Sequence, residues 1–132
     1  MAGRPGLSES EMEVLKALWD HGPGTVRDIN GLLGGRGRRW AYTTVLTLLQ
    51  RLQVKGYVAS DASGVAHRFR AEVTRAQLLE RRLRDTADDL CDGSATPLVL
   101  ALVQGNKFSA EDLARLRRLL DEAAGKSSRA KS

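Results

Sequence analysis

Three threonines, a glutamine and an arginine recur along segment 41–55, "AYTTVLTLLQRLQVK", away from its leucines. These residues are Thr43, Thr44, Thr47, Gln50 and Arg51. Such side chains can hydrogen-bond the edges of bases, and threonine methyl groups can contact the methyl of thymine. Threonine is a mediocre helix former, so three of them in one helix suggest that their side chains serve contacts made by the exposed face of the helix. The pattern predicts base reading in duplex DNA, with an exposed helix and incidental threonines as the alternative.

The same segment carries an apolar side that must be buried. At 100° per residue, five of its residues cluster on one face: Ala41, Val45, Leu48, Leu49 and Leu52. Gly56 follows, and glycine commonly stands just past the C-terminus of a helix. We therefore expect a helix over 41–55 that is held in the core by its leucines and presents its polar side outward.

Positive charge is concentrated around this helix. The chain has 132 residues and a net charge of +5, and six cations but only one anion lie between Arg27 and Lys55. The residues predicted to contact phosphate are Arg36, Arg38, Arg39, Arg68 and Arg70. Phosphate contacts add affinity and salt dependence without base information. A solvated basic surface is the alternative, and charge alone does not reject it.

Two capped helices are expected before the reading helix. Ser8 with Glu11, and Thr25 with Asp28, have the spacing of capping boxes. "HGPG" at 21–24 separates the two helices, because proline and glycine are poor in helix interiors. Two helices joined by a glycine-containing turn and followed by a third are the outline of a helix-turn-helix.

A β-hairpin is expected after the reading helix. The stretches 57–61 and 65–71 are short and β-capable, and "ASG" joins them. In the second stretch, alternation places Arg68 and Arg70 on the same side, where a wing can reach a phosphate backbone. Three helices and this hairpin predict a winged helix-turn-helix.

Three further helices are expected after residue 74, and their apolar stripes are too large for these helices to cover by themselves. We expect them to pair with the same region of a second chain, and packing against the N-terminal domain of the same chain is the alternative. The predicted dimer contacts are Leu79, Leu83, Leu98, Leu100, Leu102, Leu113, Leu116 and Leu120.

The sequence thus predicts a mainly α protein in three parts. Residues 1–72 form a winged helix-turn-helix DNA-binding domain, 73–124 a helical dimerisation domain and 125–132 a disordered basic tail. No apolar run approaches the ~20 residues of a membrane span. The N-terminus also lacks the apolar stretch of a secretory signal. We expect a cytoplasmic protein without membrane insertion.

Little in the sequence suggests catalysis or metal binding. The histidines His21 and His67 share no metal-ligand spacing, and the single cysteine excludes an internal disulfide. We interpret Cys91 as a small buried hydrophobe, with a redox sensor as the alternative. We predict no enzyme, no catalytic residues, no metal and no cofactor. The rival classes are a winged-helix module that binds protein instead of DNA and a hydrolase using Cys91 and His67.

Three stretches together resemble the penicillinase-repressor family, the BlaI/MecI repressors with their copper-responsive CopY relatives. They are "EMEVLKALWDHGPGTVRDI", "AYTTVLTLLQRLQVKGYV" and "AHRFRA". A fourth, "LVLALVQGNKFSAEDLARLRRLL", is similar to the family's dimerisation segment. The resemblance implies an N-terminal winged helix, a helical dimer module and repression by binding a palindromic operator in double-stranded DNA. It places Thr43, Thr44, Thr47 and Arg51 at DNA-facing positions.

Two features depart from the family pattern. Copper-responsive relatives carry a C-terminal cysteine cluster, so with Cys91 alone we expect no direct copper sensing. Penicillinase repressors are inactivated when a membrane-bound sensor protease triggers cleavage of an Asn-Phe bond in the apolar helix, and the matching positions are Ala101 and Leu102. The resemblance implies derepression by proteolysis in a β-lactam-type antibiotic response, with this different bond as the cleavage region.

Overall fold

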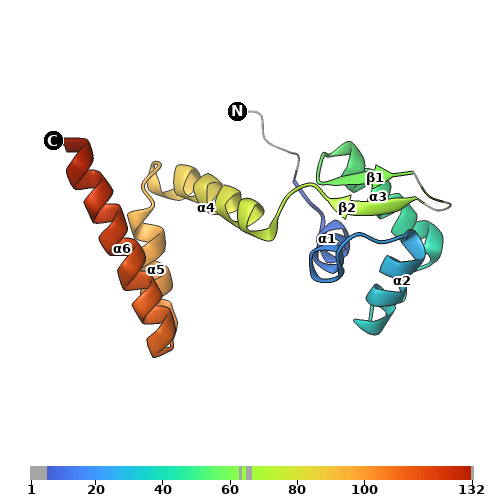
Figure 1. Ribbon diagram of the computed structural model, residues 1–132, viewed down its shortest axis with the longest axis horizontal. Coiled ribbons are helices and arrows are strands. Elements are labelled where there is room, and N and C mark those ends of the chain that lie inside the picture. Colours follow the sequence, from blue (N-terminus) through green and yellow to red (C-terminus); the bar gives the residue numbers. More distant parts are fainter. Residues whose placement is uncertain (1–5, 63, 65–66, 132) are drawn as a thin grey trace. The chain divides into compact units, whose positions relative to one another are not determined.

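The computed structural model describes residues 6–62, 64 and 67–131 of the chain, without the side chains of 127–131. Figure 1 gives the order of the elements along the chain. The chain divides into two compact units, Met1–Arg82 and Leu83–Ser132. As predicted, the structure is mainly α-helical with one small sheet.

Both predicted capping boxes are present. They begin the first two helices, α1 (Glu9–His21) and α2 (Val26–Gly35). The Ser8 hydroxyl accepts from the Glu11 amide at 3.1 Å, and the Glu11 carboxylate accepts from the Ser8 amide at 2.8 Å. Thr25 and Asp28 repeat the exchange at 3.1 and 3.0 Å. Each box satisfies two of the backbone donors that a helix start leaves free.

The helix that carries the threonines is α3 (Tyr42–Val54), one residue shorter at each end than predicted. Its buried residues are Val45, Leu48, Leu49 and Leu52. Ala41 was expected on the buried face and is instead exposed, because it is the N-cap and its backbone is extended. Gly56 follows with a φ of 88°, a left-handed conformation that favours glycine.

A two-stranded antiparallel sheet follows, formed by β1 (Val58–Asp61) and β2 (Arg68–Ala71). It confirms the predicted hairpin, although β2 is shorter than the predicted stretch, whose Val65 and Ala66 lie outside the described residues. Phe69 points into the core and is 4 % exposed. Its backbone also exchanges two hydrogen bonds with Gly24, at 2.7 and 3.0 Å, which ties the sheet to the α1–α2 connection.

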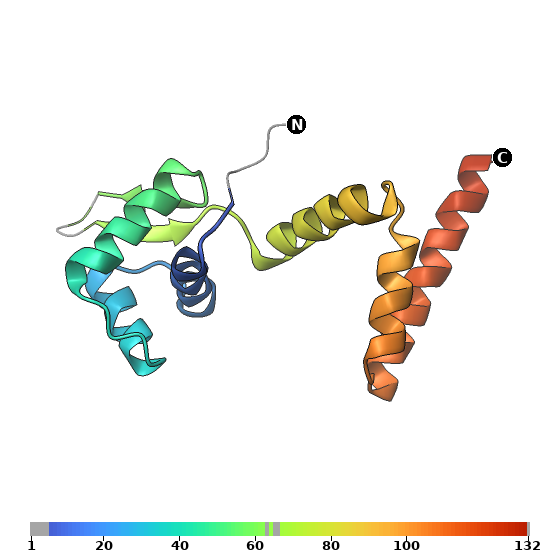
Figure 2. The ribbon, with the colours of Figure 1, turned by 180° about the vertical axis from the view of Figure 1, so that it is seen from behind.

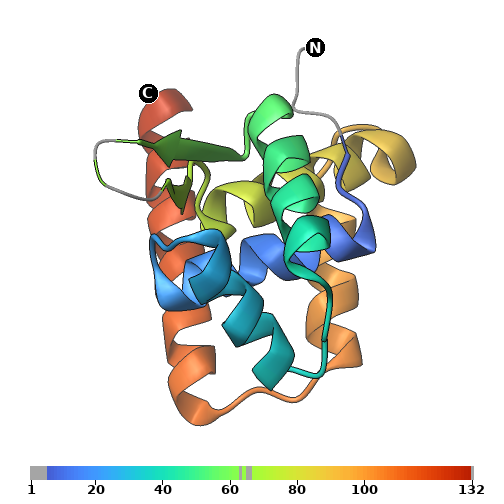
Figure 3. The ribbon, with the colours of Figure 1, turned by 90° about the vertical axis from the view of Figure 1, so that its right-hand side faces the viewer.

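One hydrophobic core joins these elements, and Figure 3 shows the three helices and the hairpin that enclose it. Its largest members are Leu15, Leu18, Ile29, Leu33, Leu48, Leu49, Leu52, Tyr57 and Phe69. Burying each large apolar side chain contributes ~1.5–3 kcal/mol, as an upper bound. Because α3 contacts α1, α2 and β1, this core determines which side of α3 remains outside.

The remaining helices are α4 (Arg75–Cys91), α5 (Thr96–Gly105) and α6 (Ala110–Lys131). Between residues 75 and 126 only Ala87 is buried. Of the leucines predicted to form dimer contacts, five are exposed, namely Leu79, Leu83, Leu100, Leu102 and Leu120, and Leu98, Leu113 and Leu116 are half-buried. No helix in the described part of the chain is both long and apolar enough to span a membrane.

The C-terminal end differs from the prediction. The backbone of α6 is helical to Lys131, through most of the segment 125–132 that we expected to be a disordered tail. The segment contains no proline, and four of its residues, Lys126, Arg129, Ala130 and Lys131, are good helix formers, so a helix that begins at Ala110 can continue into it.

Candidate nucleic-acid interface

The outer face of α3 is polar and open to solvent. All five predicted base-reading residues are exposed. Four of them, with Leu48 at the base, line one shallow hollow: Thr43, Thr44, Thr47 and Arg51. Figure 2 shows α3 in front of the hairpin, so this helix lies at a surface of the first unit. The structure therefore places the predicted residues on one accessible surface, the α3 outer face.

Thr47 makes a hydrogen bond that limits the contacts its side chain can make with a ligand. Its hydroxyl donates to the carbonyl oxygen of Thr43, one turn earlier, at 2.9 Å. The hydroxyl hydrogen is therefore occupied, whereas the methyl group and the oxygen lone pairs stay available. Thr47 is suited to contact a thymine methyl or to accept a hydrogen bond from a base amino group.

Gln50 lies toward the hairpin and lines a second hollow. This groove between α3, the start of α2 and the hairpin is lined by Thr25, Val26, Arg27, Tyr42, Leu46, Gln50, Gln53, Ser60, His67 and Phe69. Gln53 donates to the Ser60 hydroxyl at 3.0 Å, which links α3 to β1. Gln50 therefore lies on a different side of the α3 outer face from the three threonines.

Arg27 lines the same groove, although its charge alone predicted no specific contact for it. It is exposed in the first turn of α2, and no ion pair involves it among the described residues. Its position before the reading helix in a helix-turn-helix pattern was the available signal. Arg39 is likewise exposed and has no ion pair within the described part of the chain.

Two of the arginines predicted to contact phosphate form ion pairs with carboxylates of α1. Arg36 lies 2.7 Å from a carboxylate oxygen of Asp20. Arg38 lies 3.7 Å from Glu13 and 3.9 Å from Glu9, with its guanidinium 5.9 Å from the centre of the Trp40 ring. Their contact with phosphate stays a prediction, and it requires these partners to be exchanged for DNA.

The wing arginines lie on the strand face opposite Phe69. Arg68 donates to the carbonyl oxygen of Pro23 at 3.1 Å, and Arg70 lies 3.6 Å from the Glu72 carboxylate. Both side chains are exposed. The alternation predicted for this strand is confirmed for its described residues, with Phe69 buried between the two arginines.

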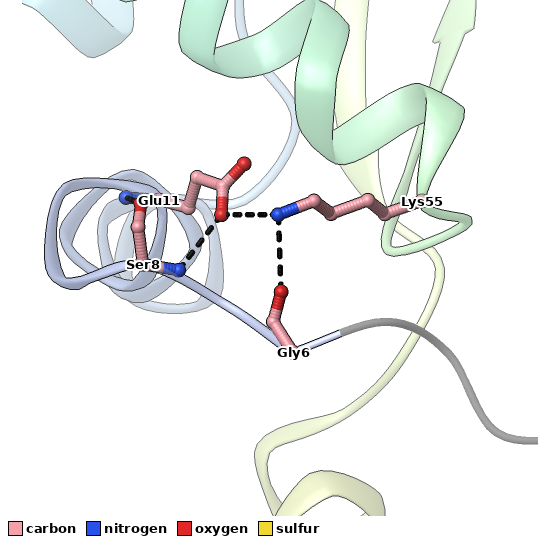
Figure 4. Close-up of polar contacts among 4 residues, drawn as sticks. All are labelled: Gly6, Ser8, Glu11 and Lys55. Atoms are coloured by element: carbon pink, nitrogen blue, oxygen red, sulfur yellow. Dashed lines mark hydrogen bonds and ion pairs between the residues drawn. The ribbon is translucent and has the colours of Figure 1, made fainter.

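Lys55, at the end of α3, is paired with a buried carboxylate (Figure 4). Its Nζ lies 2.6 Å from Glu11 Oε1 and donates to the Gly6 carbonyl oxygen at 3.0 Å. Glu11 is 1 % exposed, and the same Oε1 accepts from the Ser8 amide. Burial raises the pKa of Glu11, but the hydrogen bonds from Lys55 and Ser8 outweigh it and leave this pKa below its ordinary value. Lys55 therefore anchors α3 to the start of α1 and adds little free charge to the surface.

The described residues contain no cluster of three or more His, Cys, Asp or Glu side chains that could hold a metal ion. His21 and His67 are exposed. Cys91 was expected to be buried and is only half-buried, because little of the chain covers α4.

Comparison with known proteins assigns the chain to a family. The sequence profile of the penicillinase repressors matches residues 7–122. The chain belongs to the penicillinase repressor family. This confirms the resemblance noted from the helix and hairpin motifs, and the members of this family are transcriptional repressors, not enzymes.

Two relatives and one solved structure illustrate the membership. This penicillinase repressor family member is 34 % identical over 124 residues to the transcriptional regulator BlaI of Mycobacterium tuberculosis, covering 92 % of this chain and 88 % of that protein. It is 23 % identical over 118 residues to the penicillinase repressor of Bacillus licheniformis, covering 89 % and 91 %. The solution structure of the DNA-binding domain of the repressor BlaI matches with a TM-score of 0.50 and 25 % identity, over 58 % of this chain and 93 % of that one. The predicted fold class is confirmed.

Proposed function

We propose that this chain represses transcription by binding a palindromic operator in duplex DNA as a homodimer, with α3 in the major groove. The observation that carries the proposal is the α3 outer face, where every predicted base-reading side chain is exposed while the leucines behind it are buried. A helix displayed in this way fits a major groove ~12 Å wide. Membership of the repressor family supports the same function.

Base reading and phosphate binding are assigned to different residues. Arg51 is exposed and unpaired among the described residues, so its guanidinium is free to make two hydrogen bonds to a guanine. We assign phosphate contacts to Arg39, Arg68 and Arg70 and also to Arg27, because all four side chains are exposed. Arg36 and Arg38 would join them only by leaving Asp20, Glu9 and Glu13.

The homodimer would form through α4, α5 and α6. These helices leave large apolar side chains in water, among them Leu90 at 79 %, Leu100 at 54 % and Leu119 at 62 % exposure. Burial against a second copy would remove this apolar area from water. Two reading helices would then reach half-sites about one helical turn apart (~34 Å), and the first contact would raise the effective concentration for the second.

Derepression would act on the same helices. Ala101 and Leu102 are exposed but lie inside α5, so cleavage there requires this helix to open locally. The cut would separate α6 from the rest of the chain and lower operator affinity without touching α3. A membrane sensor protease pathway in a β-lactam-type response would supply the signal.

Thr47 offers the sharpest test of base reading. Thr47→Ala should lower the preference for operator over scrambled DNA by about 1–3 kcal/mol, the range of one mismatched base pair. Thr47→Val retains the methyl group and should keep most of that preference, because the hydroxyl hydrogen already bonds Thr43. Fluorescence anisotropy with duplexes from upstream of the gene, each paired with a scrambled duplex, measures both effects.

Two outcomes would count against the proposal. Equal losses on operator and scrambled DNA in Thr47→Ala would reject base reading by Thr47. A wild-type chain that binds no duplex, or binds all equally, would reject the operator and favour a winged-helix module that binds protein.

A further inference from the structure

The start of α4 is attached to the end of α1 by three interactions. Trp19 Nε1 donates to the carbonyl oxygen of Val73 at 2.8 Å. The Arg75 guanidinium lies 3.0 Å from Asp20 Oδ1 and 5.2 Å from the centre of the Trp19 ring. All of these residues belong to the first unit. The chain that leaves the wing is therefore held on α1 before α4 continues into the second unit. We call this group of Trp19, Asp20, Val73 and Arg75 the α4 anchor.

Asp20 extends the α4 anchor toward the reading helix. Its other oxygen, Oδ2, accepts from Arg36 at 2.7 Å, and Arg36 is the C-cap of α2. One carboxylate thus binds one arginine with each oxygen, one before α3 and one at the start of α4. Hydrogen bonds from Arg36 and then Arg75 hold the pKa of Asp20 below its ordinary value, so Asp20 is charged at neutral pH.

We propose that Asp20 and Arg75 are positioning residues that hold the start of α4 on α1 and thereby limit the half-site spacings that the dimer accepts on DNA. The inference rests on the proposed function, because it requires a dimer that binds two half-sites. It adds a determinant of operator choice that does not touch a base.

The length of α4 makes its starting direction important. The helix has 17 residues, which corresponds to about 25 Å. A change of about 10° at its first turn would move its far end by about 4 Å, more than the ~3.4 Å rise of one base pair. Because the far end of α4 leads into α5 and α6, which we propose as dimer helices, such a change would alter the separation of the two reading helices.

The anchor is suited to positioning more than to stabilising. The side chains of Arg75 and Asp20 are 59 % and 46 % exposed, and exposed ion pairs contribute little to stability. Loss of Arg75 should therefore widen the range of directions that α4 takes while the first unit stays folded.

The test uses the full chain and a series of duplexes. A duplex selected by the wild type from a random pool is rebuilt with one to five base pairs inserted between its half-sites. Five inserted pairs turn one half-site to the opposite face, and we expect the wild type to lose at least about 10-fold in affinity there. Arg75→Gln should reduce that loss to about 3-fold or less, with a small change at the original spacing. Arg75→Lys, which retains a cation for Asp20, should restore the wild-type profile.

Lys16→Gln is the matched control, because it removes one exposed cation from α1 that has no ion pair among the described residues. It should leave the spacing profile unchanged. Asp20→Asn, which keeps the side-chain shape, should weaken discrimination as Arg75→Gln does.

The outcomes separate this inference from the proposed function. An unchanged spacing profile in Arg75→Gln, or an equal loss at every spacing with a lower melting temperature, would overturn the positioning role alone. A wild type that binds no duplex would overturn the proposed function and this inference with it.

Discussion

Leucines in α3 and leucines in the C-terminal helices differ in what covers them. Leu49 and Leu52 of α3 are fully buried by α1, α2 and the hairpin, whereas Leu90 and Leu120 are 79 % and 61 % exposed. The first unit therefore completes its own core, which holds α3 by its buried leucines. The second unit exposes apolar surface that we propose a second copy covers, so its contribution to DNA binding depends on concentration.

A cavity in the first core should give the largest effect. Leu49→Ala removes a fully buried side chain and should lower the free energy of unfolding by about 2–5 kcal/mol, independent of protein concentration. Val54→Ala is the control in the same helix, because Val54 is 89 % exposed and should change stability by no more than about 0.5 kcal/mol. Denaturant unfolding measures both, and similar values for the two variants would contradict the assigned core.

A charged residue introduced into the apolar surface of the second unit should lower operator affinity by preventing dimer formation. Leu120→Glu should convert the dimer to a monomer and lower operator affinity by about 100-fold or more, because the second half-site contact is no longer intramolecular. Sedimentation and anisotropy on the same samples measure the two effects. Arg118→Glu, on the side of α6 away from the leucine stripe, should preserve the dimer. A dimeric Leu120→Glu chain would remove this residue from the interface.

Arg68→Ala should lower the affinity for operator DNA and for scrambled DNA by similar factors. It should also reduce the slope of log affinity against log salt concentration by about one. The reason is that Arg68 is proposed to hold phosphate, which carries no base information. Titrations at several salt concentrations measure the slope. An unchanged slope would mean that the wing does not contact phosphate.

The Glu11–Lys55 pair should give a small, acid-dependent effect. The pKa of Glu11 is lowered in the folded chain, so the ionised carboxylate stabilises the fold above its ordinary pKa of about 4.3, and this stability is lost as pH falls through the lowered value. Glu11→Gln should therefore be less stable than wild type at pH 7, with a smaller difference at pH 3. Thermal unfolding of both proteins at pH 7 and pH 3 measures this difference in stability. An equal difference at the two pH values would exclude the charge of Glu11 as its cause.

Local chemistry accounts for what could be predicted. The capping boxes at Ser8 and Thr25 each involve residues three apart, and the buried stripe of α3 follows from a period of 3.6 residues. The polar face of α3 was predictable for the same reason. Base and phosphate contacts themselves remain proposals.

Contacts between distant segments could not be predicted in this way. Arg36 and Asp20 are 16 residues apart, Lys55 and Glu11 are 44 apart, and Arg75 and Asp20 are 55 apart. From the sequence alone, Arg36, Lys55 and Arg75 are simply positive charges near α3 or α4. Only the packed structure shows that each one already has a carboxylate partner.

The sequence by itself determined the helix starts, the side of α3 that is buried and the set of polar side chains on its other side, because these depend on neighbours within one or two turns. The tertiary structure decided which cations remain free for a ligand and how the start of α4 is held. Ion pairing depends on distances in space, and those distances exist only after the core has brought α1, α3 and the start of α4 together.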